Sequence, residues 1–233
     1  KAKIYSPEMT EFDAKRAAYK KGELSTNDFY TYLAGLLGNK QAQFPNVGKI
    51  VELVSLEKNL DFIKVNTERD ALIETLEKAL DEKGKNKLTQ IGILYRDGSM
   101  SGAEYYKQLL DLTASANIQS ETKNLAIYRD YITLYDGINF SELSREQDKA
   151  ERQAGFSLCK SEDQRKLFVI AENSQIAANV IDLKVTKDEY NTFLSDHNVV
   201  AWADFLRAKI AANGITQTIP ASFASLEKIF PVV

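Results

Sequence analysis

The chain has 233 residues, of which 44% are hydrophobic and 27% are charged, and these fractions are ordinary for a folded globular protein. Its net charge of −3 lacks the basic excess that nucleic-acid-binding proteins usually carry, so we expect no nucleic-acid partner. The single histidine excludes sites that need two histidines from one chain, and no apolar run reaches the roughly 20 residues that span a bilayer.

Helix-start and helix-stop signals predict eleven or twelve helices and no convincing strand. Pro7, Pro45 and Pro220 each lie just before or within the first turn of a segment with helical periodicity, where the free N–H groups make proline tolerable. Ser, Thr, Asn and Asp residues cap the predicted helices, and glycines end several of them, including Gly84 after the fourth. In chain order, the predicted helices cover about residues 7–22, 25–38, 45–58, 62–82, 86–97, 101–114, 120–136, 139–160, 161–183, 186–194, 198–213 and 222–230.

Two segments of the chain match each other at one offset without gaps. Five identical pairs recur 78 residues apart, the distance from residue 46 to residue 124: Asn46 and Asn124, Leu56 and Leu134, Phe62 and Phe140, Glu68 and Glu146, and Asp70 and Asp148. A capping box, in which Ser or Thr precedes an acid by three residues, also recurs after Leu24, Met100 and Val185. Such recurrence is typical of helical repeats that stack on one another.

These patterns predict an all-α fold in which tandem duplicated helical units form an irregular helical bundle or a short α-solenoid. We expect a single all-helical region over residues 1–233, with units at approximately 24–99 and 100–184 and a partial third unit at 185–233. The alternative is that the recurring residues are independent helix-start signals that match by chance. The identities at a single gapless offset favour duplication.

Several stretches of the sequence are similar to a family of long, uncharacterised bacterial proteins. They are KKGELS at residues 20–25, PNVGKI at 45–50, LDFIKVNTERDALI at 60–73, EDQRKL at 162–167 and LKVTKDEY at 183–190, and the similarity extends over roughly residues 12–196. In that family this region resembles an all-helical insertion, and the flanking segments resemble the ChaN/TraB-like (haem-uptake/Tiki) superfamily. The acid- and histidine-bearing motifs of that superfamily lie outside the inserted helices, so the resemblance implies an accessory or recognition segment and no catalytic residue.

Tyr128, Tyr131 and Tyr135 form a candidate interaction surface. Their spacings of three and four residues place them in one stripe along a predicted helix. Such a stripe can bind a partner, because tyrosine offers a large contact area at low entropic cost. More often it is a seam between packed helices, with the hydroxyl groups in water. The sequence leaves both interpretations open.

The acidic residues of the repeated segments, Glu68, Asp70, Glu146 and Asp148, raise the hypothesis of a metal site. If the two units were related by a pseudo-twofold axis, the four carboxylates could converge on a hard cation. Interleaved Lys and Arg residues favour the alternative, in which the carboxylates lie on solvated helix faces and form ion pairs. We assign no residue as a metal or cofactor ligand.

Two single residues of chemical interest are better explained by structure than by catalysis. Cys159 follows Phe156 and Leu158 near the end of a predicted helix, which favours a buried apolar thiol. His197 lies between two predicted helices beside Asp196, and no nucleophile is identifiable near it, so we expect a loop or capping residue.

Together these observations predict a non-catalytic helical interaction or accessory module. We expect it to be part of a larger bacterial protein and to contact a protein partner or a flanking domain of the same protein. One alternative is a small-molecule or metal binder with its site between the two repeat units. Another is an accessory segment of an enzyme whose catalytic residues lie outside this chain. The sequence assigns no catalytic residue and no cofactor, and it does not indicate a compartment.

Overall fold

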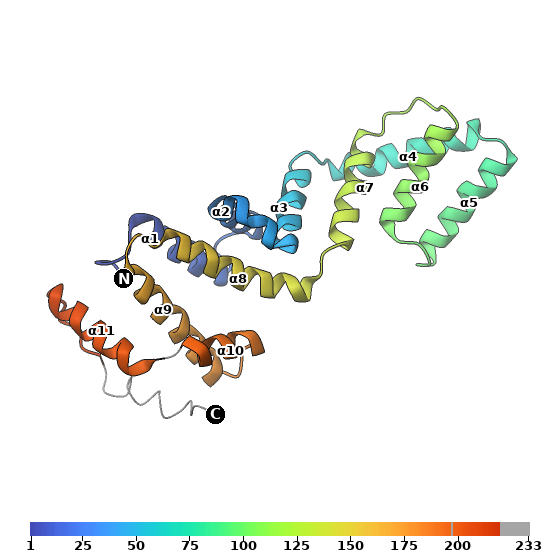
Figure 1. Ribbon diagram of the computed structural model, residues 1–233. Coiled ribbons are helices and arrows are strands. Elements are labelled where there is room, and N and C mark those ends of the chain that lie inside the picture. Colours follow the sequence, from blue (N-terminus) through green and yellow to red (C-terminus); the bar gives the residue numbers. More distant parts are fainter. Residues whose placement is uncertain (197, 220–233) are drawn as a thin grey trace. The chain divides into compact units, whose positions relative to one another are not determined.

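The computed structural model describes residues 1–196 and 198–219, and all regular structure within these ranges is helical (Figure 1). The elements, eleven α-helices and the 3-10 helix η1, are α1 Pro7–Lys20, α2 Thr26–Leu37, η1 Gly38–Gln43, α3 Pro45–Glu57, α4 Phe62–Ala79, α5 Glu82–Arg96, α6 Gly102–Ser115, α7 Lys123–Asp136, α8 Phe140–Leu158, α9 Glu162–Ile181, α10 Lys187–Asp196 and α11 Val199–Ala212. The predicted all-α fold is therefore confirmed. His197 and the predicted helix at 222–230 lie outside the described residues. Within those residues, no helix combines the length and the apolar character needed to cross a membrane.

Side-chain caps fix many of the helix starts where the sequence placed them. The hydroxyls of Ser25, Ser101 and Thr186 each accept a hydrogen bond from the backbone N–H three residues later, which satisfies a donor that has no partner within the helix. The acid of the predicted capping box returns the bond only before α10, where the Thr186 N–H donates to Glu189 Oε2 at 2.8 Å. At the start of α2, the carboxylate of Asp28 instead accepts a hydrogen bond from the hydroxyl of Ser25 at 2.6 Å.

The boundary between α4 and α5 differs from the prediction. We expected a helix from 62 to about 82 that stops at Gly84, but α4 ends at Ala79 and Gly84 lies in the first turn of α5. Asp81 caps α5, because its side chain accepts from the N–H of Gly84 at 2.8 Å. A Cβ atom on this glycine would lie 2.9 Å from Cδ2 of Leu80. Close packing at the start of a helix therefore explains a glycine that resembled a helix stop.

The chain divides into two compact units by its internal contacts. One consists of Ser25–Ala150, and the other combines Lys1–Leu24 with Glu151–Val233. The boundary between them falls within α8. This division describes packing, and the repeat units at about 24–99, 100–184 and 185–233 remain a prediction about the sequence.

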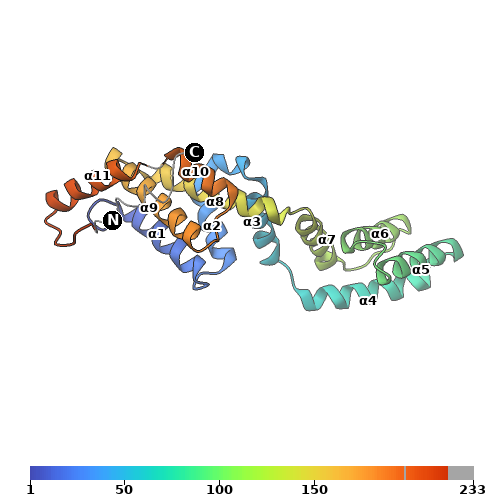
Figure 2. The ribbon, with the colours of Figure 1, turned by 90° about the horizontal axis from the view of Figure 1, so that it is seen from below.

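Within the unit Ser25–Ala150, helices α4 to α7 lie together (Figure 2). Their buried side chains form a core of their own. Leu72, Leu76, Leu109 and Leu125 have no exposed surface there. Helix α3 packs against α7, and α2 and η1 pack against α3. Burial of this many leucine and aromatic side chains supplies the main stabilisation of the four-helix group.

The other unit has a separate core and a buried ion-pair network. Helices α9, α10 and α11 enclose Phe193, Trp202 and their neighbours. The guanidinium of Arg16 on α1 lies 2.7 Å from Oε2 of Glu151 on α8 and 2.7 Å from Oε1 of Glu172 on α9. Burial disfavours the charged form of Arg16, but the two carboxylates outweigh it and raise the pKa of the guanidinium. This network joins three helices through one side chain.

Candidate functional site

Aromatic side chains form a partly exposed strip along α7 in the unit Ser25–Ala150. The ring of Tyr131 lies 6.0 Å from that of Phe62 at the start of α4, and the ring of Tyr135 lies 5.6 Å from that of Phe140 at the start of α8. Phe62, Tyr135 and Phe140 are 46%, 49% and 53% exposed. We call Phe62, Tyr131, Tyr135 and Phe140 the aromatic strip. Three of its four rings are thus about half in contact with solvent.

The three tyrosines predicted as a stripe do not share one environment. Tyr128 is partly buried and packs edge-on against Tyr106 of α6, with ring centroids 5.1 Å apart, and against Phe62 at 6.2 Å. It therefore belongs to a seam between helices, whereas Tyr135 is open to solvent. Burial raises the pKa of Tyr128 and of Tyr131, and for Tyr131 the nearby carboxylate of Glu57 adds to the effect. Both hydroxyls therefore stay protonated and can donate hydrogen bonds at neutral pH.

The seam continues inward as a stack of tyrosines. Tyr95 stacks on Tyr105 with ring centroids 4.2 Å apart, and Tyr105 meets Tyr106 edge-on at 5.1 Å. Burial raises the pKa of Tyr106, and the nearby positive charge of Arg69 on α4 opposes this rise. Through Tyr128, this row of rings contacts the part of the strip formed by Phe62 and Tyr131.

The first of two matching hydrogen-bond networks lies at the start of α3. Glu146 of α8 accepts from the N–H of Asn46 at 2.7 Å, from the Asn46 amide at 2.6 Å and from the N–H of Val47 at 3.1 Å. The side-chain oxygen of Asn46 in turn accepts from the N–H of Asn139 at 2.9 Å. We call this network the Asn46 clasp. A carboxylate from another helix therefore satisfies first-turn N–H groups of α3, which has no side-chain cap of its own.

The second network, the Asn124 clasp, lies at the start of α7. Glu68 of α4 accepts from the Asn124 amide at 2.7 Å and from the N–H of Leu125 at 3.0 Å. The side-chain oxygen of Asn124 accepts from the N–H of Asp61 at 3.2 Å. Helix α7 also lacks a side-chain cap at its N-cap residue, so the carboxylate again comes from another helix.

The two clasps correspond residue by residue at the offset of 78 found in the sequence. In each, the Asn comes from one repeated segment and the Glu and the cap residue come from the other. This result answers the question raised by the repeated acids. Glu68 and Glu146 lie in separate clasps, where each binds N–H groups at a helix start, while Asp70 is exposed and pairs with Arg69. Among the described residues, no group of three or more His, Cys, Asp or Glu side chains could hold a metal ion.

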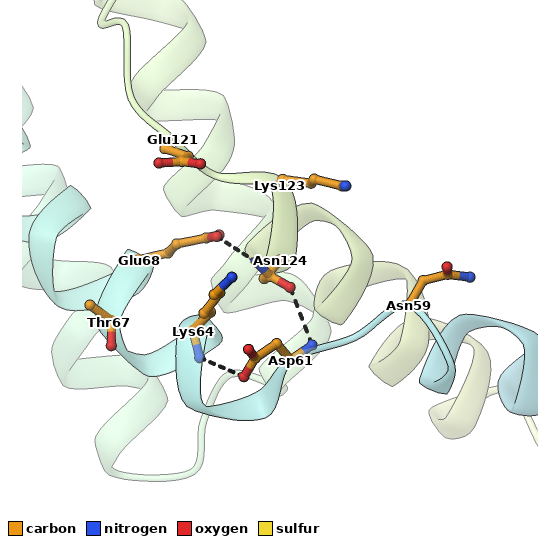
Figure 3. A pocket seen from close by; sticks show the side chains of 8 residues that line it. All are labelled: Asn59, Asp61, Lys64, Thr67, Glu68, Glu121, Lys123 and Asn124. Carbon is orange, nitrogen blue, oxygen red and sulfur yellow. Dashed lines mark hydrogen bonds between the residues drawn. The ribbon is translucent and has the colours of Figure 1, made fainter.

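A polar pocket of about 510 Å³ opens beside the Asn124 clasp (Figure 3). It is lined by Asn59, Asp61, Lys64, Thr67, Glu68, Glu121, Lys123 and Asn124. Figure 3 shows Lys64 and Glu68 extending from α4 toward Asn124, with Glu121 on the opposite wall. Within residues 1–196 and 198–219, the charged ends of Lys64, Lys123 and Glu121 form no ion pair. The pocket can therefore offer both ammonium and carboxylate groups to a small polar ligand.

Comparison with known proteins adds no assignment to this geometry. No protein-family model matches the chain, no curated protein matches its sequence, and no solved structure matches its fold.

Sequence reasoning missed two residues of the aromatic strip and most of the pocket. Phe62 and Phe140 are an identical pair at the offset of 78, and each directly follows a helix cap, so this signal could have identified them. Lys64, Lys123 and Glu121 carry no such signal, because their positions become neighbours only when α4 and α7 pack together.

Proposed function

We propose that this chain is a non-catalytic helical interaction module of a larger bacterial protein, and that the aromatic strip is its contact surface for a protein partner or a flanking domain. The observation that carries the proposal is the row of half-exposed rings at Phe62, Tyr135 and Phe140. Contiguous apolar surface on a folded domain is typical of an interaction site, and aromatic anchors dominate the energetics of such contacts.

Part of the aromatic strip packs on buried rings beneath it, which favours a role in binding over exposure without a function. Tyr131 and Phe62 pack against Tyr128, which packs against the buried Tyr106. The exposed ring of Phe62 therefore loses little conformational freedom when a partner covers it, and its binding costs less entropy as a result.

The clasps support the proposal of an internal duplication. Three equivalent residues occur in both networks, and the partners are exchanged between the two repeated segments. Reciprocal contacts of this kind are those expected from two similar units related by a twofold axis. We propose that residues 46–70 and 124–148 descend from one helical unit.

Site-specific photocrosslinking tests the contact surface. A photoreactive benzoylphenylalanine at position 135 should give a discrete crosslinked partner, and the same group at Ile93, which is 54% exposed on α5 outside the strip, should not. Once the partner is purified, Tyr135→Ser should raise the Kd of the complex by about ten-fold or more, as expected for an aromatic anchor. Ile93→Ser should leave the Kd unchanged. Equal crosslinking from both positions, or equal Kd values for the two variants, would reject the strip as the contact surface.

The polar pocket supports a second candidate, a small-molecule binder with its site between the two repeated segments. Its volume of about 510 Å³ is sufficient for a metabolite-sized ligand, and its unpaired charges would orient one. Native mass spectrometry of protein purified from cells should then reveal an added mass that disappears on denaturation. Lys64→Ala should abolish the added mass, whereas Lys107→Ala, on the exposed surface of α6, should preserve it. If no added mass is found, or if the added mass persists in Lys64→Ala, this candidate is wrong.

A further inference from the structure

The polar pocket beside the Asn124 clasp contains two carboxylates that already have hydrogen-bond partners. Asp61 accepts from two backbone N–H groups in the first turn of α4, at 3.0 and 3.1 Å. Glu68 accepts from the amide of Asn124 and from the N–H of Leu125. The hydroxyl of Thr67 donates to a carbonyl oxygen of the preceding turn at 3.2 Å. These groups serve the fold, so the other side chains of the pocket decide what it can bind.

Three charged side chains of the pocket have no such partner. Lys64 comes from α4, Lys123 from the start of α7, and Glu121 from the segment before α7. Across residues 1–196 and 198–219, none of the three charged ends forms an ion pair. In Figure 3, Lys64 points toward the clasp, and Glu121 lies on the other side of the pocket. The pocket therefore offers two ammonium groups and one carboxylate.

The other repeated segment shows that a clasp forms without these charges. At the offset of 78, the residues that correspond to Lys64, Lys123 and Glu121 are Glu142, Pro45 and Gln43. The charged residue among these, Glu142, lies 2.9 Å from the guanidinium of Arg145 and is paired with it. The Asn46 clasp is nevertheless complete. The structural role of a clasp therefore does not account for the three charges beside Asn124.

From these observations we propose that the pocket binds a free acidic amino acid. The two carboxylates of the ligand pair with Lys64 and Lys123, and its ammonium group pairs with Glu121. Such a ligand carries two negative charges and one positive charge, which complement the available charges of the pocket, and hydrogen bonds between charged groups are the strong ones. The inference rests on the second candidate function, the small-molecule binder, and it names the class of ligand.

Isothermal titration of the intact chain with L-glutamate and with L-aspartate tests the proposal. At least one of them should bind with saturation at a single site. Lys64→Ala and Lys123→Ala should each raise its Kd by about ten-fold or more, the effect of losing a hydrogen bond between charged groups. Lys107→Ala, on the exposed surface of α6, should leave the Kd unchanged. If neither amino acid binds, or if all three variants behave alike, the proposal is overturned.

Glutarate isolates the part played by the ammonium group. It has the two carboxylates of glutamate and lacks the ammonium, so the wild-type protein should bind glutamate more tightly by about ten-fold. Glu121→Gln should abolish this preference by weakening glutamate alone. This variant should fold normally, because Gln43 occupies the corresponding position beside the Asn46 clasp. Equal binding of both compounds by the wild-type protein would show a simple cationic surface and overturn the proposal.

Native mass spectrometry separates this proposal from the function on which it rests. An added mass that depends on Lys64 but belongs to a different compound, with no binding of either amino acid, would overturn the ligand class. The small-molecule site would stand in that case. If no added mass is found and neither amino acid binds, both the ligand class and the small-molecule site are wrong.

Discussion

Replacing Gly155 by alanine should lower the free energy of unfolding by about 2–3 kcal/mol, the usual cost of forcing extra volume into a well-packed core. Gly155 lies in α8, where a Cβ atom would be 2.2 Å from Cζ of Phe168 and 2.6 Å from its Cε2. Phe168 is itself buried, and its ring packs edge-on against Phe156 at 5.3 Å. The ring cannot move away without disturbing its neighbours. Overlap therefore outweighs the gain of up to about 1 kcal/mol that alanine brings within a helix.

A second glycine provides the control for this substitution. Gly92 lies within α5 and has no atom within 4 Å of the place its Cβ would occupy. Gly92→Ala should therefore stabilise the protein by about 0.5–1 kcal/mol, because it restricts the unfolded chain without a steric cost. Urea denaturation measures both effects. A similar response from the two glycines would contradict the packing argument, and recovery of stability in Gly155→Ala with Phe168→Leu would support it.

Replacing Arg16 by alanine should lower the free energy of unfolding by about 3–5 kcal/mol, the range for removing one member of a buried ion pair. The guanidinium serves both Glu151, whose side chain is only 3% exposed, and Glu172. Without it, two carboxylates face each other in a poorly solvated region. Removing the charge of these two side chains should therefore relieve part of the destabilisation.

The exposed ion pair of Arg207 and Asp204 is the matched control for Arg16. Its side chains are 56% and 69% exposed, and Arg207→Ala should change the stability by less than about 0.5 kcal/mol. Chemical denaturation at neutral pH measures both variants. Adding Glu151→Gln and Glu172→Gln to Arg16→Ala should recover part of the loss. No recovery would show that the destabilisation of Arg16→Ala comes from lost packing against Phe12 instead.

Local signals in the sequence predicted the helices better than they predicted the contacts between helices. Ser25, Ser101 and Asn198 act as caps where expected, because capping is decided within four residues of chain. The end of α4 was misplaced because Gly84 satisfies the pattern of a helix stop, whereas the actual break uses Asp81 as a cap. A glycine selected for close packing and a glycine selected for a turn look alike in a sequence.

The candidate sites show the same limit more strongly. The offset of 78 drew attention to Asn46, Glu68 and their equivalents, yet nothing in their spacing indicated that the Asn of one segment binds the Glu of the other. Likewise, periodicity placed Tyr128 and Tyr135 in one stripe, but the packing of α6 against α7 decides that one is covered and the other open. Such outcomes depend on which helices meet, and that information is not local.

The exchanged partners of the clasps constrain how this sequence can change over time. Asn46 depends on a residue 100 positions away, and Asn124 on one 56 positions away, whereas the Asn and Glu within a single segment do not touch. A substitution in either segment can therefore be compensated only in the other. Across relatives, we expect positions 46 and 146 to covary, and 68 and 124 to covary, but not 46 and 68. Neither half could be lost, or replaced by an unrelated one, without leaving the other half with unpaired helix ends.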